Sequence, residues 1–260
     1  MSIIKSNAVA PPPASGGGSP ILSSISEMNS LRFDGSSYLS RTPTTTTNSS
    51  RTTWTWSGWA KFTNITSGGR LFAAGTADTN GTSFGHLGSS PNLEATFQLY
   101  TIHSGTDYGW NSTLKLRDSS AWYHIVVIYD SSIGSGGMNA YINGVQITNF
   151  ATDYGTLPSN AQGLVNAQNS HTIGRHQTLS GGFHNGYMAN IHFIDGQALD
   201  HNSFGETISD IWVPKAYSGT YGTNGFHLDF ADGIETLPVN GSNVSAFRDK
   251  SGNDNHWQAH

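Results

Sequence analysis

The segment from Gly182 to Gly196 constrains the fold more than any other part of this 260-residue chain. Its residues alternate with a period of two, which is the pattern of a β-strand with two different faces. Strict alternation places the odd-numbered residues from Tyr187 to Phe193 on one sheet face and the even-numbered residues from Met188 to Ile194 on the other. The dipeptide Asp195-Gly196 then favours a tight turn.

Similar segments recur along the chain. Residues 122–130 are rich in β-branched and aromatic side chains, which favour strands. Residues 140–148 contain Asn143-Gly144, the dipeptide preferred in a type I′ hairpin turn. A strand is also expected at 53–62, where Trp54, Trp56, Ala60 and Phe62 would share one face. Trp59 would lie on the opposite face unless Gly58 marks a bulge, and all three tryptophans are expected in the core.

Further short strands are expected on both sides of a turn at Asp34-Gly35, and at 70–74, 95–102, 172–174 and 225–230. The one helical signal is Ser203-Phe-Gly-Glu206, which has capping-box spacing, and Gly205 limits that helix to about one turn. The chain is therefore predicted to be all-β. We expect one large antiparallel two-sheet jelly-roll sandwich over residues 30–260 rather than two small domains.

Composition excludes several classes of function. Charged residues make up only 11% of the chain, against roughly 25% in ordinary soluble domains. The net charge of -5 and the scattered Lys and Arg residues argue against nucleic-acid binding. The chain has no cysteine, which excludes disulfides and thiolate metal sites. No window approaches the roughly 18 apolar residues of a membrane span.

The expected location combines two opposing signals. Residues 1–5 lack the apolar core of a secretory signal, so synthesis in a cytoplasm is expected. The surface is instead rich in Asn, Ser, Thr and Gly, which is typical of a protein that works outside a cell. A virus particle satisfies both signals, because its proteins assemble in the host cytoplasm and later face the outside.

Residues 1–29 differ from the rest, with the runs Ala10-Pro-Pro-Pro-Ala14 and Ser15-Gly-Gly-Gly-Ser19. Proline stiffens and glycine loosens a chain, so this region is predicted to be an extended arm without a core of its own. A disordered tail is one interpretation. The other is an anchoring arm that docks on partner subunits, because it carries more apolar residues than a solvated tail requires. These residues are Ile3, Ile4, Val9, Ile21, Leu22 and Ile25.

Short motifs over residues 31–257 occur in an order that resembles the concanavalin A/laminin-G-like lectin superfamily. They are Leu31-Arg-Phe-Asp-Gly-Ser-Ser-Tyr-Leu39, Trp54-Thr-Trp-Ser-Gly-Trp59, Leu71-Phe-Ala-Ala-Gly75, Ala121-Trp-Tyr-His124, Tyr141-Ile-Asn-Gly144, Thr172-Ile-Gly174 and the strand at 186–195. Four others resemble a group of bacteriophage virion proteins common in marine phages. These are Phe193-Ile-Asp-Gly-Gln-Ala-Leu199, Phe204-Gly-Glu206, Pro214-Lys-Ala-Tyr-Ser-Gly-Thr-Tyr-Gly-Thr-Asn-Gly-Phe226 and Asp249-Lys-Ser-Gly-Asn253.

The resemblance implies a jelly roll of two curved sheets, a carbohydrate- or partner-binding surface at loops on one edge, and no catalysis. In many laminin-G-like domains an Asp-x-Ser-Gly-Asn stretch precedes the Phe-Asp-Gly strand, whereas here it comes at 249–253. Either a permuted last strand closes the sheet, or this ending is the remnant of a longer fibre.

The carboxylates argue against an enzyme. Glycosidases of this fold need two carboxylates facing each other across the substrate. The four glutamates, Glu27, Glu94, Glu206 and Glu235, lack a Glu-x-Asp-x-x-Glu arrangement. Asp229 and Asp232 are the nearest substitute, but their spacing puts them on opposite faces of a strand, so a structural role is expected.

Metal sites have weak support. The 11 histidines include no His-x-His or His-x-x-x-His pair, and His124 is expected to be a hydrogen-bonded core residue. Calcium is an option at Asp249, Ser251 and Asn253, which alternate like calcium-loop ligands, although a tight turn is favoured there. We otherwise expect no cofactor.

A sugar site needs an aromatic ring for the apolar sugar face and polar partners for the hydroxyl groups. Tyr108-Gly-Trp110-Asn111 offers that chemistry in a predicted loop, although its aromatics are equally suited to capping the core. Neighbours that could complete this candidate glycan surface are Asp107, His86, Arg175, His176 and Asn185.

The favoured function is a non-enzymatic phage virion protein, held by its arm to capsid or tail subunits and displaying a lectin-like domain towards host-surface glycans. We expect a head decoration protein or short fibre on the virion surface, and a homo-oligomer, with a trimer as one option. The alternatives are a tail-fibre receptor-binding protein and a secreted carbohydrate-binding adhesion domain. In the latter case Asn64, Asn80, Asn111 and Asn243 would be glycosylation sites.

Overall fold

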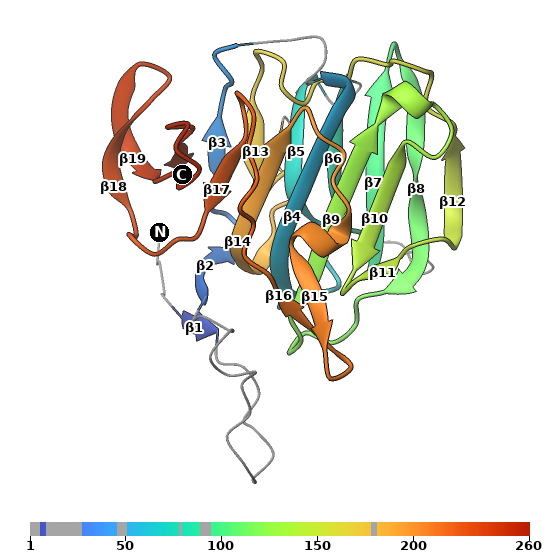
Figure 1. The fold of residues 1–260 in the computed structure, drawn as a ribbon, viewed down its shortest axis with the longest axis horizontal. Helices are drawn as coiled ribbons and strands as arrows, with labels where there is room; N and C mark the ends of the chain where they lie inside the picture. The colour runs from blue at the N-terminus through green and yellow to red at the C-terminus, as the bar shows by residue number, and fades with distance from the viewer. Residues whose placement is uncertain (1–5, 9–27, 46–50, 78–79, 89–94, 178–180) are drawn as a thin grey trace, which may run out of the picture.

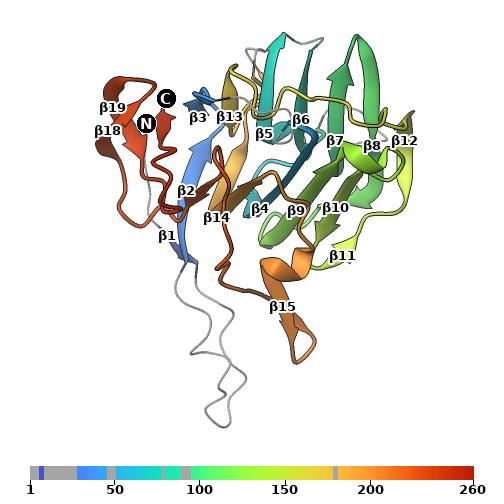
Figure 2. The same cartoon turned by 45° about the horizontal axis from the view of Figure 1, so that its top comes forward.

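A computed structural model describes residues 6–8, 28–45, 51–77, 80–88, 95–177 and 181–260. Within these residues the chain forms antiparallel strands arranged as two large sheets and one small hairpin (Figure 1). Figure 2, in which the molecule is turned, shows strands β5 to β8 of one sheet above β4, β9 and β10 of the other. The prediction of an all-β antiparallel sandwich is confirmed.

The front sheet has eight strands. Its order is β1 (Ser6–Ala8), β2 (Met28–Asp34), β14 (Asn185–Asp195), β4 (Thr53–Phe62), β9 (Tyr123–Asp130), β10 (Met138–Ile142) and β11 (Val145–Gln146), with β17 (Phe226–Leu228) also paired to β14. One edge of β14 is shared between two partners. Residues 185–189 pair with β2, and residues 191–193 pair with β17.

The back sheet has ten strands. Its order is β12 (Phe150–Gly155), β8 (Thr106–Lys115), β7 (Thr96–His103), β6 (Asn80–His86), β5 (Gly69–Ala77), β13 (His171–Ile173), β3 (Leu39–Arg41), β20 (Trp257–Ala259), β19 (Ser242–Phe247) and β18 (Glu235–Val239). The small hairpin consists of β15 (Gly205–Ile208) and β16 (Ile211–Pro214). Two 3-10 turns, η2 (Ser131–Ile133) and η3 (His201–Ser203), complete the elements named here.

The main core lies between the two sheets and is rich in aromatic side chains. Trp54 and Trp56 are fully buried on the inner face of β4, as predicted. Gly58 occupies the next inward position of that strand, where a Cβ would lie 2.6 Å from Cη2 of Trp56. The glycine therefore makes room for an indole ring and does not mark a bulge. Trp59 faces outward, as predicted, and stacks on His124 with a centroid separation of 4.9 Å.

The strict alternation predicted for β14 is wrong, because a bulge interrupts the strand. The register with β4 shifts between Ala189 and His192, and Asn190 has a left-handed φ of 47°. Met188 therefore points into the main core together with Ile191, although their numbers differ in parity. A bulge reverses which residues face inward, which is the known consequence of one extra residue.

Two local predictions have opposite outcomes. The type I′ turn at Asn143-Gly144 is confirmed, since φ is 49° and 78° and the turn joins β10 to β11. The helical turn predicted from the 203–206 spacing is wrong. The 3-10 turn lies earlier, at His201–Ser203, because the Asp200 side chain accepts from the Asn202 N–H, and residue 206 belongs to β15.

The last strand, β20, pairs with β3 and β19 inside the back sheet. The 249–253 segment thus leads into an interior strand, which joins the β18–β19 hairpin to β3. At the other end, β1 pairs with β2 as an edge of the front sheet, and β2 begins at Met28, two residues before the expected start of the sandwich. The apolar arm residues from Ile3 to Leu22 lie outside the described residues.

Candidate functional site

The outer face of the front sheet is partly covered by residues 196–225, which we call the cover segment. It carries the 3-10 turn η3, the β15–β16 hairpin and the loop that leads to β17. A second apolar cluster joins the front sheet to the cover segment. Val126 and Ile194 come from the sheet, and Phe204, Tyr217 and Tyr221 come from the cover segment. Figures 1 and 2 show the hairpin projecting beyond the sheet.

The cover segment is also fixed by hydrogen bonds. Thr55 Oγ1 donates to the Gln197 carbonyl at 2.8 Å and accepts from the Leu199 N–H at 2.8 Å. Trp212 Nε1 donates to His124 Nδ1 at 2.9 Å, and the other ring nitrogen of His124 lies 2.9 Å from Ser57 Oγ. The prediction that His124 is a hydrogen-bonded core residue is therefore confirmed.

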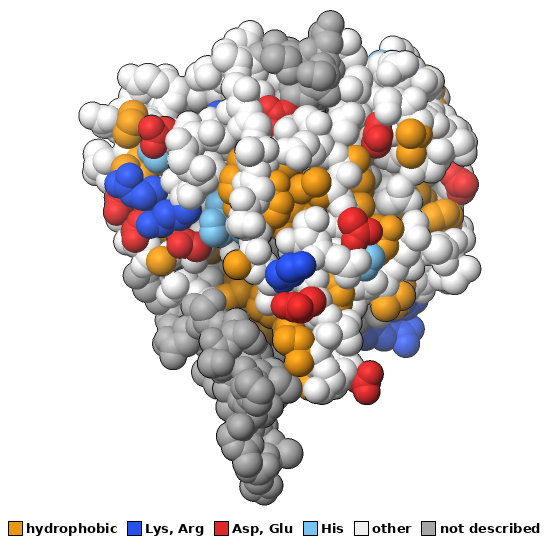
Figure 3. Space-filling model, viewed as in Figure 1, with side chains coloured by type: hydrophobic (Ala, Val, Ile, Leu, Met, Phe, Trp, Pro, Cys, Tyr) orange, Lys and Arg blue, Asp and Glu red, His pale blue; other side chains and the backbone are white. Residues whose placement is uncertain are grey.

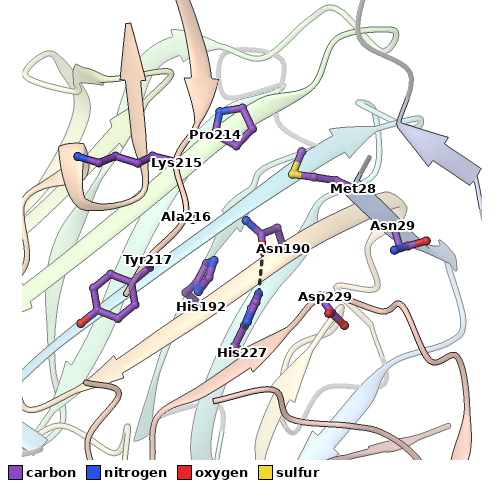
Figure 4. Close-up of a pocket in the computed structure, with 10 residues that line it drawn as sticks. All are labelled: Met28, Asn29, Asn190, His192, Pro214, Lys215, Ala216, Tyr217, His227 and Asp229. Atoms are coloured by element: carbon purple, nitrogen blue, oxygen red, sulfur yellow. Dashed lines mark hydrogen bonds between the residues drawn. The ribbon is translucent and has the colours of Figure 1, made fainter. Parts of the chain in front are cut away.

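A hollow of about 310 Å³ opens beside this cover segment. It lies at the edge of β14 where one partner strand replaces another. The pairing with β2 stops at Ala189 and the pairing with β17 starts at Ile191, on either side of the Asn190 bulge. Figure 3 shows hydrophobic side chains gathered near the centre of this face, with several charged side chains beside them. The lining, drawn in Figure 4, is Met28, Asn29, Asn190, His192, Pro214, Lys215, Ala216, Tyr217, His227 and Asp229. We call this hollow the outer pocket.

Two stacked histidines form the centre of the outer pocket. The rings of His192 and His227 are nearly parallel, with centroids 4.1 Å apart. His227 Nε2 lies 2.8 Å from Asn190 Oδ1, and because an amide oxygen can only accept, the imidazole donates (Figure 4). His192 Nδ1 lies 2.8 Å from the hydroxyl of Tyr221. The bulge thus directs an amide to a histidine on the neighbouring strand.

Both histidines of the stack are held neutral. Burial lowers the pKa of His192 well below 6.5, and the neighbouring His227 lowers it further. Burial also lowers the pKa of His227, although Asp229 and Asp249 act in the opposite direction. Nε2 of His192 is buried and has no hydrogen-bond partner among the described residues. The two histidines therefore offer neutral donors and acceptors, and the cation of the lining is Lys215, whose Nζ donates to the Asn202 carbonyl at 3.2 Å.

The chemistry of the outer pocket fits a sugar ring. Tyr217, Pro214 and Met28 offer apolar surfaces for the C–H face of a sugar, while Asn29 and Asn190 offer amides for its hydroxyl groups. Asp229 is the only carboxylate in the lining, and its Oδ1 already accepts from the Ala231 N–H at 3.0 Å. Hydrolysis of a glycoside normally needs two carboxylates, so this arrangement is suited to binding.

The structure places the predicted glycan residues differently. Residues 107–111 lie in strand β8 of the back sheet and not in a loop. Trp110 is only 5% exposed; its ring stacks on Phe150 at 4.9 Å and its Nε1 donates to the Met138 carbonyl at 3.2 Å. Asn111 is buried between Gln98 and Tyr154. Tyr108 packs against the core, whereas Asp107 is exposed. The alternative interpretation, that these aromatics cap the core, describes Tyr108 and Trp110 correctly.

The other four predicted neighbours do not join them. His86 is buried in β6, with Nε2 3.0 Å from the Asn64 carbonyl. Arg175 stacks its guanidinium 3.8 Å above the ring of Tyr38, and His176 is half-exposed in the same loop. Asn185 lies in the front sheet, where its Oδ1 accepts from Arg32 at 2.7 Å. Five of the eight residues thus lie in the back sheet, Asn185 lies in the front sheet, and Arg175 and His176 lie in the loop after β13.

The calcium candidate forms a tight turn, as favoured from the sequence. Asp249 is buried, and its two carboxylate oxygens accept from the N–H groups of His227, Ser251 and Asn255 and from the Ser251 hydroxyl. The Asn253 amide donates to the carbonyls of Gly222 and Gly225. These groups fix the end of the cover segment. Across the described residues, no group of three or more His, Asp or Glu side chains is arranged for a metal ion.

Sequence reasoning missed most of the outer pocket. Its residues come from positions 28, 190, 214–217 and 227, which no local motif unites. The one available signal was the 214–226 motif, which supplies Tyr217 and leads to His227. The positive φ of Asn190, which creates the gap, depends on the pairing of β14 with three other strands.

Comparisons with known proteins agree with this fold. No curated protein matches the sequence. A putative carbohydrate-binding protein from Bacteroides ovatus is 14% identical, with a TM-score of 0.57, over 90% of this chain and 58% of that protein. The enzymatically active domain of tailspike protein 2 from bacteriophage CBA120 is 16% identical, with a TM-score of 0.52, over 78% of this chain and 28% of that one.

This chain thus corresponds to only part of the length of those two proteins. In the described residues no helix is long and apolar enough to cross a membrane. Residues 33–202, which are more than half of the chain, match a laminin-G-type family of the concanavalin A-like lectin/glucanases superfamily. The chain therefore belongs to this family of lectin-like domains.

Proposed function

We propose that this chain is a non-enzymatic sugar-binding domain displayed on the surface of a bacteriophage particle, and that the outer pocket holds the sugar. The observation that carries the proposal is the combination of apolar and polar groups around one hollow of about 310 Å³. Sugar pockets need both, because a pyranose ring has C–H faces and a hydroxyl rim.

The single carboxylate of the lining supports binding without hydrolysis. Asp229 has no second carboxylate across the pocket, and the nearby buried Asp249 is engaged by four protein donors. Asp232, the other residue of the predicted pair, forms ion pairs with Lys250 and Arg248. One carboxylate in the lining, with the other two engaged by protein donors or cations, supports binding rather than hydrolysis.

The phage setting rests on sequence and on fold similarity. A nearly uncharged surface with 11% charged residues, the four motifs shared with phage virion proteins, and a fold similar to a tailspike domain all support it. The arm expected to bind capsid or tail subunits lies outside the described residues, so anchoring is part of the proposal. A head decoration protein or short fibre remains our preferred form, with a tail fibre or a secreted adhesion domain as alternatives.

The pocket is best tested by replacing Asn190 with glycine. The residue has a left-handed φ, which glycine adopts without strain, so Asn190→Gly removes the amide while keeping the bulge. Asn160→Gly is a matched control, because Asn160 has a φ of 57° in an exposed turn and does not line the pocket.

The measurement is a glycan array followed by titration calorimetry on each glycan that binds. We expect Asn190→Gly to weaken binding about five- to ten-fold, the loss of one hydrogen bond, and Asn160→Gly to leave it unchanged. Equal affinity of both variants and the parent would contradict the pocket assignment. Electron microscopy of the phage with an antibody against the sandwich tests display; label absent from intact particles would contradict it.

A further inference from the structure

A row of alternating cations and aromatics crosses the outer face of the front sheet. It consists of Arg32 from β2, Tyr187 from β14, Lys61 from β4 and Trp122, which immediately precedes β9. Tyr187 is the direct cross-strand partner of both Arg32 and Lys61. Four side chains from neighbouring strands thus lie side by side, and we call them the cation–aromatic row.

All four side chains are partly exposed on the face turned away from the core. Leu31 and Phe33 on β2, and Ala60 and Phe62 on β4, belong to the main core. Because successive side chains alternate, Arg32 and Lys61 must point outward. The row lies beyond the Ala189–Trp59 pair, three residues along β14 from the Asn190 bulge, or roughly 10 Å from the outer pocket.

The row is held in place by contacts among its own members. The Arg32 guanidinium lies 5.3 Å from the centre of the Tyr187 ring. Its nitrogens donate to Asn185 Oδ1 at 2.7 Å and to the Gly186 carbonyl at 3.2 Å. The rings of Trp122 and Tyr187 are 6.3 Å apart and tilted by 58°. These contacts fix the direction of the guanidinium and of one ring before any ligand arrives.

The two cations have no carboxylate partner within the described residues. The ion pairs found there use Arg248, Lys250 and two histidines instead. Lys61 contributes to lowering the pKa of Asp118, after the hydrogen bonds from Ser120 that are the main cause. The Asp118 carboxylate is engaged by the N–H and hydroxyl of Ser120. In a chain of net charge -5, this row is a local positive site.

We propose that the cation–aromatic row binds an acidic glycan, a polysaccharide that carries sulfate or carboxylate groups. Aromatic rings suit the C–H faces of sugars, and Arg and Lys suit their anionic substituents. Two cations in one row are too few for a nucleic-acid backbone. The inference rests on the proposed function and deepens it, because it assigns the chemical class of the glycan.

The experiment compares dextran with dextran sulfate, which share a backbone, and adds polygalacturonate as the carboxylated probe. Binding is measured by affinity electrophoresis for the parent, Lys61→Gln, Trp122→Ala and the control Lys115→Gln, which changes a half-buried lysine in β8 of the back sheet. We expect Lys61→Gln to weaken binding of a charged probe about two- to five-fold, and Trp122→Ala to weaken it up to about ten-fold. Added salt should weaken binding of the charged probes.

Each outcome decides between two statements. The row inference is supported if the parent binds either charged probe more tightly than dextran, and if both row variants lose this preference while Lys115→Gln keeps it. The charged probe that binds then identifies sulfate or carboxylate as the recognised group. Equal binding of all variants to the charged probes overturns the row inference. If the row variants behave like the parent while Asn190→Gly loses a neutral glycan, the row fails and the proposed pocket stands. The reverse pattern overturns the pocket and retains the row.

Discussion

Buried neutral histidines should make this protein sensitive to mild acid. His86, His124, His171, His184 and His192 are all at most 4% exposed. Burial is the main cause that lowers their pKa values, to about 4 for His86 and about 3 for His124, His171 and His184. In the unfolded chain each would titrate near its ordinary value of about 6.5.

The sign and size follow from proton linkage. Between about pH 6.5 and the folded pKa values the unfolded chain binds more protons, so stability is complete above about pH 6.5 and falls as the pH decreases. One such histidine lowers the free energy of unfolding by about 1.2 kcal/mol between about pH 6 and pH 5. This value is nearly the same for any pKa of about 4 or less in the folded state. The four histidines with pKa values of about 3 or 4 would together lose about 5 kcal/mol, which is comparable with the whole stability of many domains.

His184→Leu isolates one of these contributions. His184 is fully buried and packs edge-on against Phe33 and Phe62, and leucine fills a similar volume. The free energy of unfolding in urea, followed by tryptophan fluorescence at several values between about pH 7.5 and 5, should fall less steeply in the variant, by about 1.2 kcal/mol over the last unit.

The control is His103→Leu, which removes a half-exposed imidazole at the end of β7. Applied to this variant, the same measurement shows how much a change from imidazole to leucine alters the slope where the ring is not fully buried. Carboxylates do not contribute to the slope between about pH 7.5 and 5, since they are ionised in both states above about pH 5. An identical slope for His184→Leu and the parent would refute the claim that burial of neutral histidine drives the acid response.

Three further substitutions test the packing described above. Gly58→Ala should lower the free energy of unfolding by about 1–3 kcal/mol, because its Cβ would meet the Trp56 ring; unchanged urea midpoints would show that the indole can move. Asp249→Ala should cost about 3–5 kcal/mol, because four donors and the buried Arg41 lose an acceptor or counter-charge; a thermal melt within a degree of the parent would argue otherwise. Trp212→Phe should lower the free energy of unfolding by about 1 kcal/mol, because the hydrogen bond to His124 is lost. A smaller decrease, measured by urea unfolding, would indicate that a water molecule replaces the indole N–H.

Local patterns predicted the strands well and their finer geometry less well. The hairpin at Asn143-Gly144 and the inward face of β4 follow from neighbouring residues, so the sequence was enough. The bulge at Asn190 depends on β14 having β2 and β17 on one edge and β4 on the other, which is a property of the assembled sheet. The predicted loop at Trp110 is instead part of β8, a strand held between two partners, β7 and β12.

The candidate site was harder to predict for the same reason. Met28, Asn190 and His227 are far apart in the sequence and meet only where two strands end against a third. The stacked histidines carry no short-range signal, because their contact is between a bulged strand and its edge partner. A motif search finds residues close in sequence, whereas this pocket is made by a gap in a sheet edge.

The pairing of β3 with β20 has a consequence for how the protein is made. Residues 39–41 find their partner only at 257–259, so the back sheet keeps an open edge while the ribosome translates everything between. Trp257, which packs against Phe226 and Phe72, is absent until then. A nascent chain cut short before this point lacks both the edge partner and the tryptophan. Completion of the back sheet at β3 therefore waits until residues 257–259 have been synthesised.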